Sequence, residues 1–145
     1  MSNTQLHTHA IELLKQLIAT PSFSKEEDKT AFIIEGFLKE HGIKTNRHLN
    51  NTWAVNQFFD ESKPAILLNS HHDTVKPNKG YTVDPFTPIE KDGKLFGLGS
   101  NDAGGSLVSI ISTFLHFNSQ ENLKYNLVLG ISAEEEISGK NGIES

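Results

Sequence analysis

Two short runs of consecutive apolar residues constrain the fold most strongly. Residues 65–68 form the first run, directly after Pro64, and residues 127–131 form the second. Continuous apolar runs of this length, unlike alternating ones, are typical of strands buried on both faces of a parallel sheet. Each run ends directly before a cluster of polar residues. The sequence therefore predicts two buried strands whose carboxyl ends carry a site.

Apolar residues at helical spacing predict helices between the strands. Residues 8–19 and 104–117 show this spacing, and Ser24 followed by Glu27 matches a capping box that would start another helix. Short strands are expected at residues 43–49 and 52–58, and a hairpin within residues 86–96. The alternation of helices and strands predicts a three-layer α/β domain with a mostly parallel sheet.

Composition narrows the possible partners and compartments. The chain has 145 residues, enough for one domain, with no cysteine and a formal net charge of −5. The lack of cysteine excludes disulfides and thiolate metal ligands, and the acidic balance argues against a nucleic-acid partner. No signal peptide is apparent, and the apolar runs are far shorter than the ~20 residues of a membrane helix. We therefore expect a cytoplasmic protein without a membrane partner.

The first polar cluster, residues 70–75, reads Ser-His-His-Asp-Thr-Val. In an extended segment alternate residues point to the same side, so His71 and Asp73 can share a site while His72 faces away. A metal-bound histidine usually donates its other ring N–H to a carboxylate, which Asp73 could supply. Taken alone, a solvated polar turn explains this cluster about as well.

The second polar cluster, residues 97–105, reads Gly-Leu-Gly-Ser-Asn-Asp-Ala-Gly-Gly. Its first glycines resemble a dinucleotide-binding loop, but that fingerprint requires a third glycine where this chain has Asp102. A carboxylate would repel a pyrophosphate, so a nucleotide-binding domain is the weaker interpretation. In isolation Asp102 is best interpreted as a helix N-cap, although its two oxygens could also bridge two metal ions.

The third polar cluster is Glu134-Glu135-Glu136, which only Ser132 and Ala133 separate from the second apolar run. Most glutamate runs form solvated helix faces, but a helix surface is not expected immediately after a strand. Like charges this close raise the pKa of at least one carboxyl unless cations intervene. The three clusters together offer nitrogen and carboxylate ligands without sulfur, which suits a hydrolytic divalent metal, zinc first.

In this order, the three clusters resemble the zinc aminoacylase/carboxypeptidase family of metallopeptidases, which includes acetylornithine deacetylase and succinyl-diaminopimelate desuccinylase. The family pattern is Ser/Gly-His-x-Asp-x-Val, then a glycine-rich segment ending in Asp-x-x-Gly-Gly, then Asp/Glu-Glu-Glu. The chain follows this pattern at residues 70–75, 97–105 and 134–136. The resemblance implies a zinc-exopeptidase-like α/β/α catalytic domain and is closest to the deacetylases of N-acylated ornithine.

The resemblance also implies roles for individual residues. His71, Asp102 and Glu136 would be metal ligands, with Asp102 bridging two Zn²⁺ (or Co²⁺) ions. Asp73 would orient His71, Glu135 would be the general base, and the peptide bond after Asp102 would be cis. The implied reaction removes an acyl group from an N-acyl amino acid such as N-acetylornithine, as in arginine biosynthesis. Other N-acyl amino acids and dipeptides are alternative substrates.

Parts of the family pattern are absent from the chain. The family requires an acidic ligand beyond the glutamate cluster, a histidine near the end of a much longer chain, and a second domain that forms a homodimer. We therefore expect residues 1–145 to be the N-terminal part of a truncated catalytic domain. Such a chain would bind zinc weakly and be inactive alone. A non-catalytic remnant of such an enzyme is the alternative hypothesis.

Overall fold

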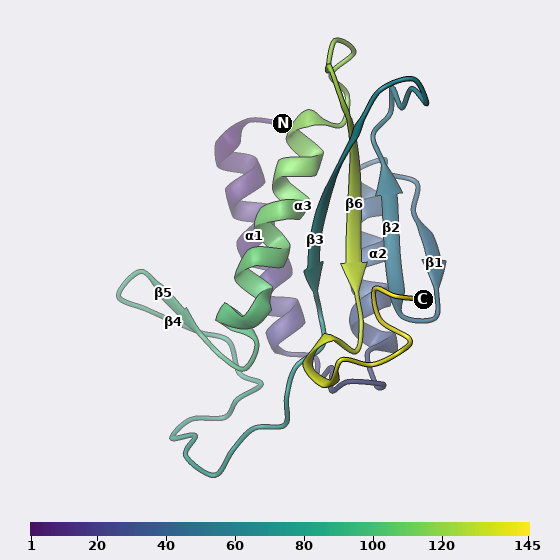
Figure 1. Cartoon of the computed structure of the whole chain (residues 1–145). Coiled ribbons are helices and arrows are strands. Elements are labelled where there is room, and N and C mark those ends of the chain that lie inside the picture. The colour runs from purple at the N-terminus through teal and green to yellow at the C-terminus, as the bar shows by residue number, and fades with distance from the viewer.

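The computed structural model describes residues 1–145 and confirms the α/β class (Figure 1). The helices are α1 (Asn3–Ile18), α2 (Asp28–Glu40) and α3 (Ser106–Phe117). The main sheet contains β1 (Asn46–His48), β2 (Asn51–Val55), β3 (Ala65–His71) and β6 (Asn126–Ser132). The predicted hairpin is formed by β4 (Ile89–Lys91) and β5 (Lys94–Phe96). None of the helices combines the length and apolar character that a bilayer crossing requires.

The main sheet is mixed, with the strand order β1-β2-β6-β3. Its β3–β6 pair is parallel as expected, in a register that runs from Ala65 opposite Asn126 to His71 opposite Ser132. The other two pairs are antiparallel, so the expectation of a mostly parallel sheet holds only for β3 and β6. For β1 and β2 the antiparallel pairing follows from the short connection. Only residues 49 and 50 join these strands, whereas a parallel pair needs a long crossover.

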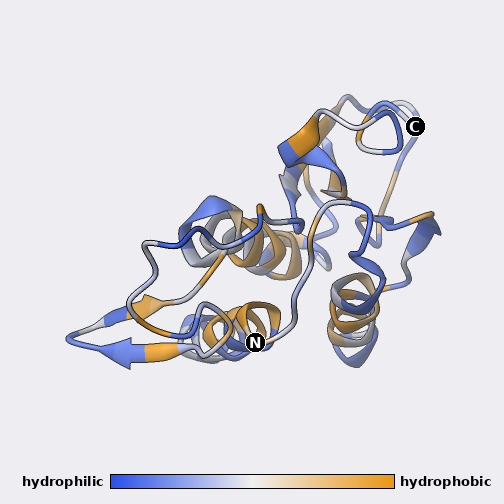
Figure 2. Ribbon diagram, turned by 90° about the horizontal axis from the view of Figure 1, so that it is seen from below, coloured by the Kyte–Doolittle hydropathy of each residue, from blue (hydrophilic) through white to orange (hydrophobic).

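All three helices pack on the same side of the sheet (Figures 1 and 2). They share one apolar core with β6, which contributes Leu127, Leu129 and Ile131. The helix residues of this core are Leu13, Leu14, Ile18, Ile34, Leu38, Leu107, Val108, Ile111 and Phe114. Residues 1–145 thus supply two of the three layers that the sequence predicted, the sheet and one layer of helices.

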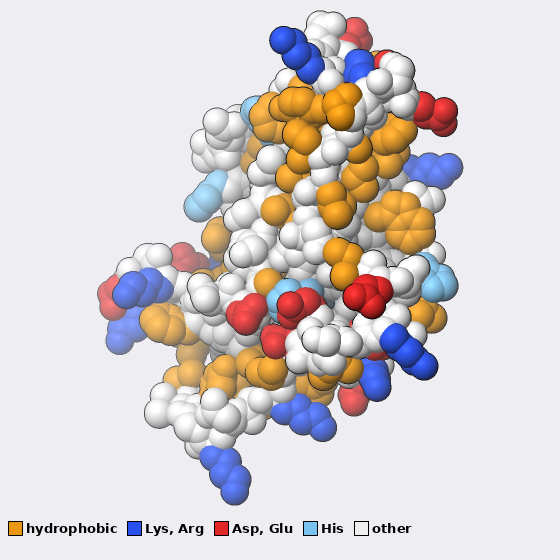
Figure 3. All heavy atoms as spheres, viewed as in Figure 1, with side chains coloured by type: hydrophobic (Ala, Val, Ile, Leu, Met, Phe, Trp, Pro, Cys, Tyr) orange, Lys and Arg blue, Asp and Glu red, His pale blue; other side chains and the backbone are white.

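The side of the sheet opposite the helices is an open face, defined here by Trp53, Val55 and Leu67. These side chains are 38%, 42% and 55% exposed, and orange side chains gather over this face in Figure 3. The expectation that residues 65–68 are buried on both faces was therefore wrong. The run lies in β3, which is an edge strand and has no helix over its outer face. An apolar run indicates what a strand tends to bury and cannot indicate what covers it.

The predicted capping box before α2 was also wrong. The helix begins at Asp28, and its N-cap residue Glu27 makes no side-chain capping bond. The Ser24 hydroxyl instead donates to Asp73, and the Glu27 carboxylate accepts from Asn50 and Glu134 in other loops as well as from the nearby Lys25 N–H. Long-range polar partners have replaced the local capping interaction at this helix start.

Candidate metal centre

The parallel pairing of β3 and β6 brings the polar clusters to one edge of the sheet. Both arrows in Figure 1 point to this edge, where Figure 3 shows acidic side chains around an imidazole. His71 is the last residue of β3, and Glu136 lies in the short turn Glu135–Ile137 that follows β6. Asp102 comes from the irregular segment Ser100–Gly105 that leads into α3. Three segments distant in sequence therefore converge.

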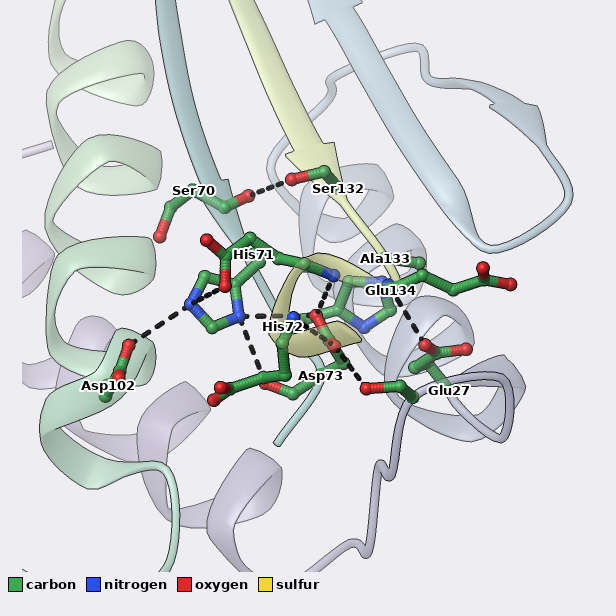
Figure 4. A network of polar contacts seen from close by, with 12 residues as sticks. Glu27, Ser70, His71, His72, Asp73, Asp102, Ser132, Ala133 and Glu134 are labelled. Carbon is green, nitrogen blue, oxygen red and sulfur yellow. Dashed lines mark hydrogen bonds and ion pairs between the residues drawn. The ribbon is translucent and has the colours of Figure 1, made fainter. Parts of the chain in front are cut away.

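His71, Asp102 and Glu136 form the one group of potential metal ligands in the structure. Each offers one ligand atom, and these atoms lie within 4.8 Å of one another. The His71 Nε2 atom is 3.2 Å from Asp102 Oδ1 (Figure 4). His71 is buried, Asp102 is exposed and Glu136 is half-buried. One imidazole and two carboxylates are the donor types that zinc and cobalt accept, so the residues fit such an ion.

The second ring nitrogen of His71 is held by Asp73. Nδ1 lies 3.1 Å from the Asp73 carbonyl oxygen and 3.3 Å from its carboxylate Oδ1. The hydrogen bond that the His71 ring donates to the Asp73 carboxylate raises the pKa of His71 to about 9, against the effect of burial and with help from neighbouring carboxylates. Without a metal, the imidazole is therefore protonated at neutral pH. It must lose this proton to bind a metal ion, because only the neutral imidazole is a ligand.

Asp73 is fully buried and also holds the glutamate cluster. Its oxygens accept hydrogen bonds from the backbone N–H groups of Glu135 and Glu136, both at 3.1 Å, and from the Ser24 hydroxyl at 2.7 Å. Burial acts to raise the pKa of Asp73, but the bonds from His71, Ser24 and the backbone outweigh it and lower the pKa to about 2. One carboxylate thus orients groups from both strand ends.

Glu135 and Glu136 differ in exposure and surroundings. The Glu135 side chain is 59% exposed, with its Oε2 atom 3.6 Å from His71 Nε2. Burial raises the pKa of Glu136, and the negative charge of Asp102 adds to this effect. Such crowding of carboxylates is relieved when a cation lies between them.

The irregular segment before α3 exposes Asp102 instead of using it as a cap. The N-cap residue of α3 is Gly105, without a side-chain capping bond, and the Asp102 side chain is 77% exposed. Gly99 has φ 74°, and a side chain at Gly104 would collide with the Gly99 carbonyl, so the loop requires both glycines. The expected cis peptide bond between Asp102 and Ala103 is present.

His72 points away from the three ligands, as predicted. It is 6% exposed, its Nε2 atom donates to the Asn50 carbonyl at 2.9 Å, and its Nδ1 atom lies 2.9 Å from the Thr30 hydroxyl. Burial lowers the pKa of His72, which keeps the imidazole neutral. This histidine ties β3 to α2 and to the β1–β2 turn.

The contributions of Ser24 and Glu27 to this region were not predicted from the sequence. Ser24 binds Asp73, and Glu27 binds the backbone of Glu134. These pairs are separated by 49 and 107 residues in the chain. The only local signal was the capping-box pattern, which predicted a different use of the same two side chains.

Comparison with known proteins identifies relatives of this chain. The family model of peptidase family M20/M25/M40 matches residues 67–145. The chain is 31% identical to an acetylornithine deacetylase from Edwardsiella ictaluri, over 92% of this chain and 38% of the relative. It is 29% identical to a succinyl-diaminopimelate desuccinylase from Rickettsia bellii, over 89% of this chain and 35% of the relative. The chain thus spans little more than a third of the length of these curated relatives.

A solved structure shows the same fold at lower sequence identity. The crystal structure of a dinuclear metal-binding peptidase of the M20 family from Bacillus subtilis superimposes with a TM-score of 0.70 at 20% identity. The match covers 97% of this chain and 38% of that protein.

Proposed function

This chain belongs to peptidase family M20/M25/M40, and on that basis we propose that residues 1–145 supply the N-terminal part of the catalytic domain of a metal-dependent amidohydrolase. The proposed reaction removes the acyl group from an N-acyl amino acid, with N-acetylornithine as the first candidate. The main support for this proposal is that His71, Asp102 and Glu136 converge from three segments, with ligand atoms within 4.8 Å of one another.

In the proposed centre, His71, Asp102 and Glu136 would hold the metal, since their ligand atoms lie within 4.8 Å of one another. A Zn²⁺ or Co²⁺ pair held there would supply a water of lowered pKa and a Lewis acid for the scissile carbonyl. Asp73 fixes the imidazole of His71 through Nδ1, 3.3 Å away.

Glu135 is the proposed general base. Its exposed carboxylate lies beside the ligands, 3.6 Å from His71 Nε2, where it can reach a water and a substrate amide. It takes a proton from the attacking water and returns it to the leaving amine.

The open face and the partial coverage of the relatives support a catalytic domain that extends beyond these residues. The match covers 38% of the deacetylase, so about 62% of it has no counterpart in this chain. We propose that further metal ligands and a dimerisation domain lie in a segment corresponding to that unmatched part. The 145-residue chain alone should therefore bind Zn²⁺ weakly and hydrolyse no amide. Measurable hydrolysis by the purified chain would contradict this part of the proposal.

A chimera tests the proposed reaction. Residues 1–145 replace the matched segment of the Edwardsiella ictaluri deacetylase, and the Co²⁺-loaded protein is assayed on N-acetylornithine, N-succinyl-diaminopimelate and a dipeptide. We expect hydrolysis of N-acetylornithine, which Glu135→Gln abolishes without loss of metal. Preference for one of the other two amides would reassign the substrate. A folded, metal-loaded chimera that hydrolyses none of them would favour a non-catalytic remnant.

A further inference from the structure

Glu27 is a fully buried carboxylate outside the proposed metal ligands, at 0% exposure in the turn before α2. Burial of a carboxylate is costly unless its oxygens are hydrogen-bonded. Oε1 accepts from the backbone N–H groups of Lys25 at 2.7 Å and Glu134 at 3.1 Å, and Oε2 accepts from the Asn50 amide at 2.9 Å. Figure 4 shows Glu27 beside the backbone of Glu134. The polar partners of this side chain come from three separate loops.

The bond to Glu134 reaches the loop that carries the proposed base and one metal ligand. Glu134 has φ 54°, a left-handed conformation that residues other than glycine rarely adopt. Three successive backbone N–H groups of this loop, at residues 134–136, are taken up by buried carboxylates. Glu27 binds the first, and Asp73 binds the next two. The path of the loop is therefore fixed by two carboxylates, of which only Asp73 also contacts His71.

The partners of Glu27 require a carboxylate at this position and not merely a polar side chain. Arg47 donates to Glu35 at 2.9 Å and to Asn50 Oδ1 at 3.0 Å. Since a guanidinium only donates, the oxygen of the Asn50 amide faces Arg47 and its NH₂ group faces Glu27. Glu27 consequently meets donors at both oxygens. A glutamine would place its own NH₂ group against one of these donors.

We propose that Glu27 is a positioning residue for the metal centre, which fixes the acidic loop at Glu134 and thereby delivers Glu136 to the other two ligands. This inference rests on the proposed function, because it takes Glu136 as a metal ligand. The two carboxylates have different tasks in this loop. Asp73 binds the backbone N–H groups of Glu135 and Glu136, and Glu27 binds that of Glu134, where the turn begins.

The test measures Co²⁺ affinity of the 145-residue chain by titration calorimetry and visible absorption, together with thermal unfolding of the metal-free protein. Glu27→Gln should lower the Co²⁺ affinity about tenfold or more, as expected for loss of a buried charge-assisted hydrogen bond. Glu40→Gln is the matched control, since it makes the same change in charge at an exposed site, and should leave the affinity unchanged.

A compensating variant separates positioning from simple stabilisation. In Glu27→Gln/Asn50→Asp, the new NH₂ group faces a carboxylate, which still accepts from Arg47, and the oxygen of the glutamine side chain still accepts from the Glu134 N–H. We expect this double variant to recover Co²⁺ affinity to within about threefold of wild type, a difference below the worth of one hydrogen bond. A merely structural role predicts instead a lower unfolding midpoint with wild-type affinity in the folded protein.

The outcomes separate this inference from the proposed function. If wild type binds no Co²⁺, either as the 145-residue chain or within the chimera with the deacetylase, both fail. If wild type binds Co²⁺ and folded Glu27→Gln binds it equally well, only the role of Glu27 is overturned. If Glu27→Gln does not fold, the double variant decides. Wild-type affinity supports the role of Glu27, whereas weak binding or failure to fold overturns it, because the double variant restores the donor–acceptor pattern around residue 27.

Discussion

The carboxyl ends of β3 and β6 contrast with the open face of the same sheet. At the strand ends, Asp73 is fully buried and each of its oxygens has donors within these 145 residues. On the open face, Trp53 and Leu67 are 38% and 55% exposed, with no helix packed over them. The candidate site is thus organised by contacts within residues 1–145, whereas the outer face of the sheet has no covering layer among these residues.

Replacement of Asp73 should have the largest effect, because it removes the centre of the organised region. For Asp73→Ala we expect a loss of about 3–5 kcal/mol in the free energy of unfolding, as when one partner of a buried ion pair is removed. Co²⁺ binding should disappear together with this stability. Urea unfolding and Co²⁺ titration measure the two effects. Wild-type Co²⁺ affinity in this variant would show that the buried carboxylate does not organise the ligands.

A matched pair of leucine substitutions tests whether the two faces of the sheet differ in burial. Leu129 is 0% exposed and faces the helices, so Leu129→Ala should lose about 2–5 kcal/mol in the free energy of unfolding. Leu67→Ala, on the open face, should lose less than about 1 kcal/mol, as is usual at exposed sites. Both values come from urea unfolding at one protein concentration. Equal losses would mean that the open face is covered in solution.

The pH dependence of metal binding tests the electrostatics of the organised region. The pKa of His71 is raised to about 9 in the metal-free protein, chiefly by the hydrogen bond with Asp73. Because a metal ligand must be the neutral imidazole, the ion competes with this proton. The Co²⁺ affinity should therefore rise about tenfold per pH unit from about pH 7 and level off near pH 9. Calorimetry in buffers of different ionisation enthalpy measures the released proton, and a constant affinity over this range would contradict the account.

Ser24→Ala should have the smallest effect of the series. The variant removes one hydrogen bond to Asp73, at 2.7 Å, and leaves the two backbone bonds and the contact with His71 in place. We expect a loss of about 1 kcal/mol in the free energy of unfolding and a modest decrease in Co²⁺ affinity. Ser62→Ala provides an exposed serine control. A loss as large as that of Asp73→Ala would place the hydroxyl, and not the shared carboxylate, at the centre of the site.

The sequence predicted the convergence of the three polar clusters because strand direction and side-chain chemistry are both local properties. Continuous apolar runs located β3 and β6, and parallel pairing then placed His71 and the glutamate cluster at one edge. The spacing of His71, His72 and Asp73 also predicted that His72 would face away. These inferences needed no knowledge of distant partners.

The uses of Ser24 and Glu27 could not be predicted in the same way. Their spacing is that of a capping box, but both side chains bind groups that are distant in sequence. The apolar run in β3 likewise gave no information on whether a layer covers its outer face. The errors therefore fall where a residue's environment is set by tertiary contacts, which a local pattern does not record.

Anomalous scattering at the cobalt edge, from a crystal of the chain saturated with Co²⁺, would show whether the three segments bind one common metal site. We expect an anomalous peak within bonding distance of His71 Nε2 and of carboxylate oxygens of Asp102 and Glu136, with Asp73 still bound to His71 Nδ1. The absence of a peak at this position, with the three side chains turned apart at saturating Co²⁺, would contradict this expectation.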